Sequence, residues 1–200
     1  MRHARLLPLP FVALALAACQ PSAPPPADAP AEASAAAADG RPAPDAPGEA
    51  LLEADGVTPA NPGGRGTALK FAFGMPEADV VSAMSQMRGG QAPTRGANAE
   101  CPVGPLTFAD WGDDLQFVFA DGRLAGWTAG DGAPRGFTTL AGIGVGSTVA
   151  ELKAAYPEAQ IREDSIGPEF AAGEIYGTLS GTGDDARVTG LWAGASCIFR

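Results

Sequence analysis

The chain has 200 residues, 46% of them hydrophobic, and a formal net charge of −10 from 13 Lys and Arg against 23 Asp and Glu. This acidic balance excludes simple electrostatic binding to nucleic acid or to an anionic lipid surface. The single histidine, His3, lies in a segment that we expect to be removed. A mature chain without imidazole excludes Ser-His-Asp triads, Cys-His pairs and His-based zinc sites.

Residues 1–18 are typical of a secretory signal peptide. Two arginines precede an apolar stretch that is too short to cross a membrane as a helix, and small residues follow. The tetrapeptide LAAC, Leu16–Cys19, resembles the lipobox of bacterial lipoproteins, in which a peptidase cuts before a cysteine that carries diacylglycerol. This resemblance implies a palmitate-bearing anchor on Cys19, and Gln20 after it favours the outer membrane. The alternative is an ordinary secretory signal in which the cysteine is accidental.

A disordered tether is expected over residues 19–67. Residues 20–64 contain 14 alanines, 10 prolines and no aromatic residue. Such a composition cannot bury enough apolar surface to offset the entropy of ordering the chain. Without the signal peptide, 11 basic and 23 acidic residues give the mature chain a net charge of −12. We expect the tether to hold the following domain clear of the membrane.

One domain of ordinary size is expected over residues 68–200, where aromatic and branched residues alternate with turn residues. The segment 69–84 aligns with the segment 141–156 at a shift of 72, and strand patterns follow each segment. The alignment predicts an α+β fold of two tandem repeats, at about 68–136 and 137–200. Each repeat would be a short helix followed by an antiparallel β-meander, with the helices packed on one sheet face.

Local signals mark where the two helices start and where one hairpin turns. Pro76 suits the first turn of the earlier helix. Thr148 with Glu151 three residues later predicts a capping box for the later helix, with Ser147 as the alternative N-cap. The tripeptide 120–122, Ala-Asp-Gly, predicts a tight turn between two strands.

Two cysteines lie in the expected domain, Cys101 and Cys197. In an oxidising compartment an even pair predicts a disulfide, here closing a loop of about one hundred residues. The alternative is two free or metal-binding thiols, although two cysteines alone make a poor metal site.

No catalytic, cofactor-binding or metal-binding residues are predicted. Gly142, Gly144 and Gly146 form G-x-G-x-G, whereas the dinucleotide fingerprint is G-x-G-x-x-G after a buried strand, so we expect no nucleotide to bind. The aspartates lie in expected turns, where this residue type is common for backbone reasons. Among the aromatic residues, Trp111 and Trp192 are each followed closely by a turn glycine, and we take them as the candidate partner surface.

The later helix motif carries a resemblance to a known family. The run GIGVGSTVAELKAAYP at 142–157, the pattern G-x-x-Y-G-x-L at 173–179 and the strand RVTGL at 187–191 resemble bacterial envelope lipoproteins with a β-lactamase-inhibitor-protein-like domain. The small lipoprotein of the outer-membrane β-barrel assembly machinery shares that general build. The resemblance covers 69–200, and it departs from the motif at 75–76, where Met-Pro replaces small hydroxyl residues.

The resemblance implies a non-enzymatic function. We expect a lipid-anchored, periplasm-facing binding or scaffold protein of the bacterial envelope, held to the membrane through Cys19 and acting by contact with an envelope protein. The alternative is an inhibitor of a periplasmic or secreted hydrolase, and a third class is an enzyme that uses carboxylates alone.

Overall fold

The structure is a computed structural model, which describes residues 50–59 and 68–199. All of these residues belong to one compact unit, Gly40–Arg200. A second unit, Met1–Asp39, lies outside the described residues, and so does the expected lipidation site, Cys19.

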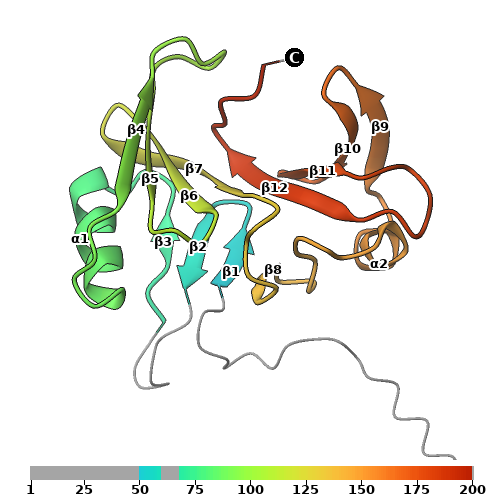
Figure 1. The fold of residues 1–200 in the computed structure, drawn as a ribbon, viewed down its shortest axis with the longest axis horizontal. Helices are drawn as coiled ribbons and strands as arrows, with labels where there is room; N and C mark the ends of the chain where they lie inside the picture. Colours follow the sequence, from blue (N-terminus) through green and yellow to red (C-terminus); the bar gives the residue numbers. More distant parts are fainter. Residues whose placement is uncertain (1–49, 60–67, 200) are drawn as a thin grey trace, which may run out of the picture. The chain divides into compact units, whose positions relative to one another are not determined.

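The larger element of the fold is an antiparallel sheet of eight strands, which Figure 1 shows as a curved layer. It runs without a break because β7 pairs with β12 through Ala129 and Leu191. In spatial order the strands are β4 (Thr94–Asn98), β5 (Leu106–Asp110), β6 (Leu115–Ala120), β7 (Arg123–Ala129), β12 (Val188–Gly194), β11 (Ile175–Leu179), β10 (Gly167–Ala172) and β9 (Gln160–Asp164).

A smaller mixed sheet has four strands in the order β3, β2, β1 and β8. Its central strand β1 pairs antiparallel with β2 and parallel with β8. The bounds are β1 Ala50–Glu53, β2 Gly56–Pro59, β3 Phe71–Ala72 and β8 Phe137–Thr139.

The hairpin of β1 and β2 corrects the tether boundary expected from the sequence. The composition predicts that residues 50–59 belong to the disordered tether, yet Leu52 and Val57 are fully buried. The physical reason is non-local, because Ala50 pairs with Phe137, 87 residues further along the chain. Composition within a local window cannot detect that pairing. The remaining tether residues lie outside the described residues.

Two short helices complete the unit, α1 (Glu77–Met87) and α2 (Val149–Ala155). The capping box predicted for α2 is confirmed. The Glu151 N–H donates to the Thr148 hydroxyl at 3.2 Å, and the Thr148 N–H donates to the Glu151 carboxylate at 2.7 Å. Helix α1 starts after Pro76 without a side-chain cap.

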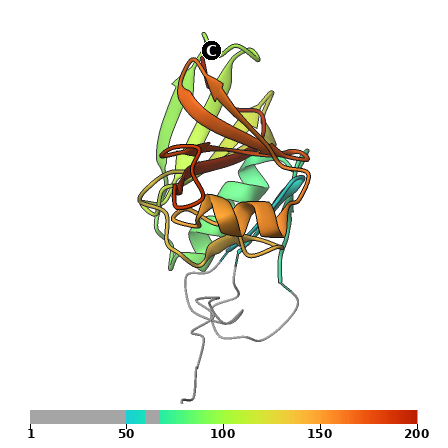
Figure 2. The same ribbon diagram turned by 90° about the vertical axis from the view of Figure 1, so that its right-hand side faces the viewer.

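One main hydrophobic core lies between the large sheet and the other elements. Figures 1 and 2 show α1, α2 and the small sheet on the same side of the eight-stranded sheet. Phe71 of β3 meets Phe117 of β6 edge to face at 5.9 Å, and the indole N–H of Trp127 donates to the Glu53 carbonyl at 2.8 Å. Val80 of α1 is fully buried in the same core.

The predicted α+β fold of two helix-plus-meander repeats is wrong. The described residues are mostly β, with helices of 11 and 7 residues. The strands that follow the two helices join into one continuous sheet, and a second sheet forms from strands outside both expected meanders. Helix-start signals are local, whereas sheet continuity depends on pairings across long sequence separations.

Candidate binding groove on the concave face

The face of the large sheet turned away from the core carries the candidate site. Side chains alternate between the two faces of a strand. Leu191 and Ala193 of β12 enter the main core, so Trp192 between them lies on the opposite face. Direct cross-strand partners place one row on this face from β5 to β9: Asp110, Gln116, Thr128, Trp192, Tyr176, Ala171 and Gln160.

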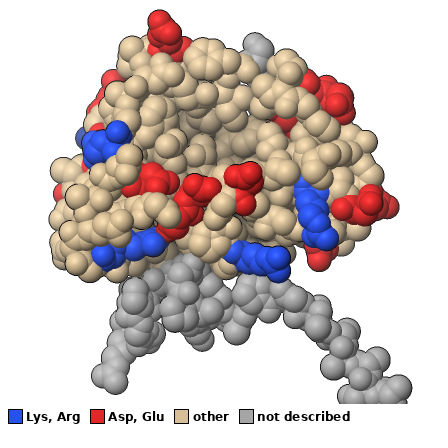
Figure 3. Space-filling view, viewed as in Figure 1, with Lys and Arg blue, Asp and Glu red and all other residues tan. Residues whose placement is uncertain are grey.

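This face is concave. Figure 1 shows the two ends of the sheet, at β4 and β9, rising on either side of the middle strands. The space-filling view shows a hollow between these ends, and its visible lining carries neither acidic nor basic groups (Figure 3). We call this surface the concave face.

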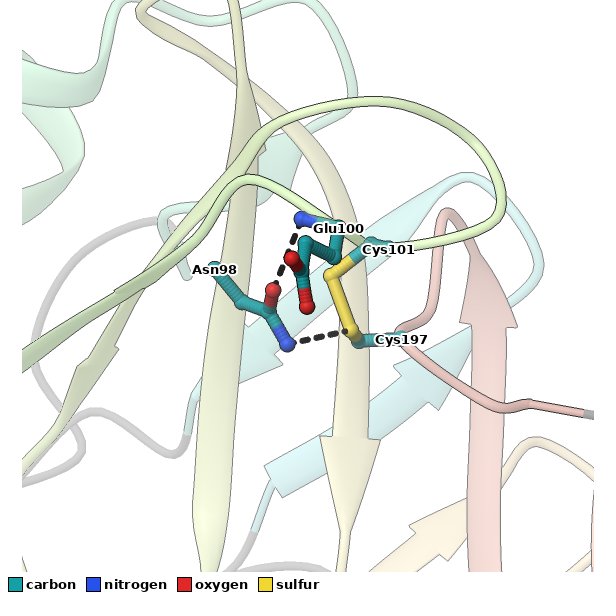
Figure 4. Close-up of a disulfide and its surroundings, with 4 residues drawn as sticks. All are labelled: Asn98, Glu100, Cys101 and Cys197. Atoms are coloured by element: carbon teal, nitrogen blue, oxygen red, sulfur yellow. Dashed lines mark hydrogen bonds between the residues drawn. A yellow bond between two sulfur atoms is a disulfide. The ribbon is translucent and has the colours of Figure 1, made fainter.

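Two segments cover the part of the concave face formed by β5 and β6. They are the loop 99–105 and the C-terminal tail 195–199, joined by the Cys101–Cys197 disulfide with a Cα–Cα distance of 4.8 Å (Figure 4). The predicted disulfide is therefore confirmed. Cys101 packs with Leu106 and Val118 in a small second core, in which Val118 is fully buried.

We call the loop 99–105, the tail 195–199 and the disulfide between them the disulfide clamp. Asn98, at the end of β4, bonds to both the loop and the disulfide (Figure 4). Its side-chain amide donates to the Cys197 sulfur at 3.3 Å, and its side-chain oxygen accepts from the Glu100 N–H at 2.8 Å. The asparagine thus fixes the start of the loop and the disulfide with one side chain.

The tail lies directly on the sheet where β7 has no side chain. The Ala195 N–H donates to the Ala125 carbonyl at 2.8 Å. A Cβ atom at Gly126 would lie less than 3.0 Å from backbone atoms of Ala195 and Ala193. Gly126 is therefore required for the tail to cross the sheet at this point.

Beside this clamp the concave face opens into a groove of about 480 Å³. Its floor includes Tyr176 and Trp192, whose rings stack at 6.1 Å with an angle of 18° between their planes. Its walls carry exposed apolar side chains, with Val103 63% and Phe199 55% exposed. The lining residues are Pro102, Val103, Tyr176, Trp192, Gly194, Ser196, Ile198 and Phe199.

The two predicted surface tryptophans have different places. Trp111 is 4% exposed, meets Phe117 edge to face at 5.8 Å, and donates from its indole N–H to the Gln91 carbonyl at 3.1 Å. It belongs to the main core, so its assignment to the partner surface is wrong. Trp192 is 6% exposed and lines the groove as part of its floor.

Sequence analysis missed the groove walls. Val103 and Ile198 follow the two cysteines closely, and Phe199 comes next. The pairing of the cysteines was the available signal, because a disulfide brings together the apolar residues that flank both of them.

Three groups with a shifted pKa, Asp55, Lys70 and Glu151, lie outside the groove. A hydrogen bond from the Lys70 ammonium lowers the pKa of Asp55, and the same contact raises the pKa of Lys70. At the start of α2, the hydrogen bond from the Thr148 N–H lowers the pKa of Glu151, and the Thr148 hydroxyl adds to this effect.

The expected turn aspartates include Asp113, which forms an ion pair with Arg88. Among the described residues, no group of three or more His, Cys, Asp or Glu is placed to hold a metal ion. Within the same residues no helix has the length and apolar character needed to cross a membrane.

No family model, curated protein or solved structure matches the chain.

Proposed function

We propose that this protein is a lipid-anchored, non-enzymatic binding protein of the bacterial cell envelope, which holds a partner protein in the groove of its concave face. The observation that carries the proposal is the pair of exposed apolar walls at Val103 and Phe199. Exposed apolar surface lining a hollow is typical of interaction sites.

The groove has the composition of a protein interface. Aromatic residues are enriched at such interfaces, and here a stacked tyrosine and tryptophan, Tyr176 and Trp192, form part of the floor. The walls are joined by the Cys101–Cys197 disulfide, so less conformational entropy would be lost when a partner binds.

Two features support the proposed envelope location, one in the sequence and one in the structure. The tetrapeptide Leu16–Cys19 supports lipidation of Cys19, and the outer membrane facing the periplasm is the expected position. The disulfide supports an oxidising compartment such as the periplasm.

Affinity capture with the tagged full chain, expressed in bacterial cells, tests the proposal. The groove variant carries Val103→Ser and Phe199→Ser, and the matched control carries Leu140→Ser. Leu140 is 77% exposed and follows β8 in the small sheet. Its replacement by serine therefore removes exposed apolar surface without changing the groove. We expect the groove variant to lose a partner that the wild type and the control both retain.

The outcome is measured as the amount of each co-purified protein relative to bait. Equal recovery by all three baits would contradict the proposal. If the partner lost by the groove variant is a single hydrolase, the binding function is inhibition, which an activity assay on that hydrolase would establish.

A further inference from the structure

We propose that the groove binds a cationic segment of the partner protein, in which an apolar side chain enters the groove and flanking Lys or Arg residues meet its acidic edges. This inference rests on the proposed function and adds the chemistry of the partner. It follows from the charge of the described unit and from the position of particular acids.

The described part of the chain is strongly acidic. Residues 50–59 and 68–199 contain 8 Lys and Arg and 18 Asp and Glu, a net charge of −10. Such a surface attracts a cationic partner over distances up to about 10 Å at ordinary ionic strength, and it repels an anionic one.

Most basic groups of the described residues are engaged within the chain. Six of the eight bond to a carboxylate or to a backbone carbonyl, which leaves the acidic excess uncompensated. Four form ion pairs, namely Lys70 with Glu53 and Asp55, Arg88 with Asp113, Arg95 with Glu77, and Lys153 with Asp184. Two donate to carbonyls, Arg123 to Gly74 at 2.8 Å and Arg187 to Gly146 at 2.7 Å.

Two exposed acids, Glu100 and Glu174, each lie two residues along the chain from a residue that lines the groove. Glu100 directly precedes Cys101 in the covering loop. Glu174 lies in the turn between β10 and β11, directly before Ile175 and two residues before Tyr176. Figure 3 shows acidic groups on both raised ends of the sheet, with a basic group beside them on the left-hand end and the uncharged hollow between the two ends.

The middle of the groove supplies the apolar contact. Val103 and Phe199 on the walls would pack against an inserted aliphatic or aromatic side chain, above the Tyr176 ring. A flanking cation would be attracted by the carboxylate of Glu100 or Glu174. Cations are also attracted to the faces of aromatic rings. A segment with an apolar centre and basic residues on either side can contact all of these groups, whereas acidic flanking residues would place like charges together.

Three fluorescein-labelled peptides of equal length test the inference. Each has the same central Leu-Phe pair, and the flanking residues are Lys in the first, Gln in the second and Glu in the third. Their binding to the purified full chain in neutral detergent is measured by fluorescence polarisation at low salt and at about 0.5 M salt. We expect the Lys peptide to bind most tightly, the Glu peptide least, and the difference to shrink at high salt.

Matched variants assign the effect to the groove. Glu100→Gln with Glu174→Gln should weaken the Lys peptide about fivefold at low salt and leave the Gln peptide unchanged. The control, Glu158→Gln with Asp185→Asn, removes two exposed acids that lie further along the chain from every lining residue than Glu100 and Glu174 do, and it should leave both affinities unchanged. Phe199→Ser should weaken the Lys and Gln peptides alike.

Three results would overturn the inference that the partner segment is cationic. They are equal affinity for the Lys and Glu peptides, no binding of any peptide, and a loss of Lys-peptide affinity in the control variant that equals the loss in the Glu100 and Glu174 variant. The affinity capture described above would then still decide the proposed function, because it depends on Val103 and Phe199 and not on the charge of the peptide.

Discussion

At the scale of single residues, the groove depends on two glycines and one asparagine. Gly126 lets the tail contact β7, and Gly194, its cross-strand partner, has a φ of 71° that favours glycine. Asn98 bonds to the disulfide and to the loop that follows it. None of these roles is visible in the local sequence, because each depends on a segment distant along the chain.

Gly126→Ala is expected to destabilise the protein by about 1–3 kcal/mol, because the new methyl group would overlap the backbone of Ala195 and push the tail away. Gly96→Ala is the control, since its Cβ would meet the Phe108 ring at an ordinary 3.5 Å on the same face. Urea unfolding of both variants measures the difference. Equal stabilities would show that the tail does not lie on β7 as described.

The capping box of α2 predicts a pH dependence. Its hydrogen bonds lower the folded-state pKa of Glu151, so the stability that they contribute is complete above the ordinary glutamate pKa of 4.5. That stability is lost as the pH falls through the lower folded-state pKa. Glu151→Gln should therefore cost about 0.5–1 kcal/mol near pH 7 and less near pH 3.

Urea unfolding of wild type and variant at the two pH values provides the measurement. Glu158→Gln, beyond the end of α2, is the control for loss of a carboxylate without loss of a cap. A cost for Glu151→Gln that stays constant between the two pH values would contradict the role of the charged form.

At the scale of elements, the disulfide clamp is the feature that shapes the groove. Cys101 and Cys197 are 96 residues apart, and in the chain-entropy model such a link stabilises the fold by about 4–5 kcal/mol. Cys101→Ser with Cys197→Ser should therefore lower stability by about 2–5 kcal/mol and free the tail from the sheet.

Amide hydrogen exchange at Val118 and Ala195 measures whether the tail is freed from the sheet. Both amides should lose protection in the double variant, while the amide of Leu152 in α2 should stay protected. Wild type under reducing conditions should behave like the variant. Full protection of Ala195 without the disulfide would show that hydrogen bonding alone holds the tail.

Elements with local signals were predicted well. The α2 capping box, the turn after Ala120 and the strands around it all rest on residues within a few positions of each other. Asp121 and Gly122 in that turn both have positive φ, as a tight hairpin requires. The β1 hairpin was missed because its neighbours in sequence are alanine, proline and glycine, and its burial depends on β8 and β3.

At the scale of the whole molecule, the fold class was wrong because matching local segments did not determine how the strands join. Arg123 and Arg187 do make equivalent bonds to Gly74 and Gly146, but the sheet passes continuously from β7 to β12. The groove was missed for the same reason, since its walls meet through a disulfide between two segments that are 96 residues apart in the chain.

The predicted lipid anchor is also tested on the whole chain. Cys19→Ala should release the protein from membranes and abolish labelling with radioactive palmitate, because the thiol is the group that would carry the lipid. Cell fractionation and metabolic labelling measure both effects, and Cys101→Ser with Cys197→Ser is the control for loss of cysteine as such. Persistent labelling of the Cys19 variant would contradict lipidation at this residue.

The most direct test of the groove as a partner site is site-specific photo-crosslinking of the full chain in living bacterial cells. A photoreactive phenylalanine analogue replaces Val103 in one variant, Phe199 in a second and Leu140 in the control, which are all exposed. We predict that Val103 and Phe199 both crosslink to the same partner protein and that Leu140 does not. Crosslinks from Leu140 alone, or from none of the three, would contradict the assignment of the groove.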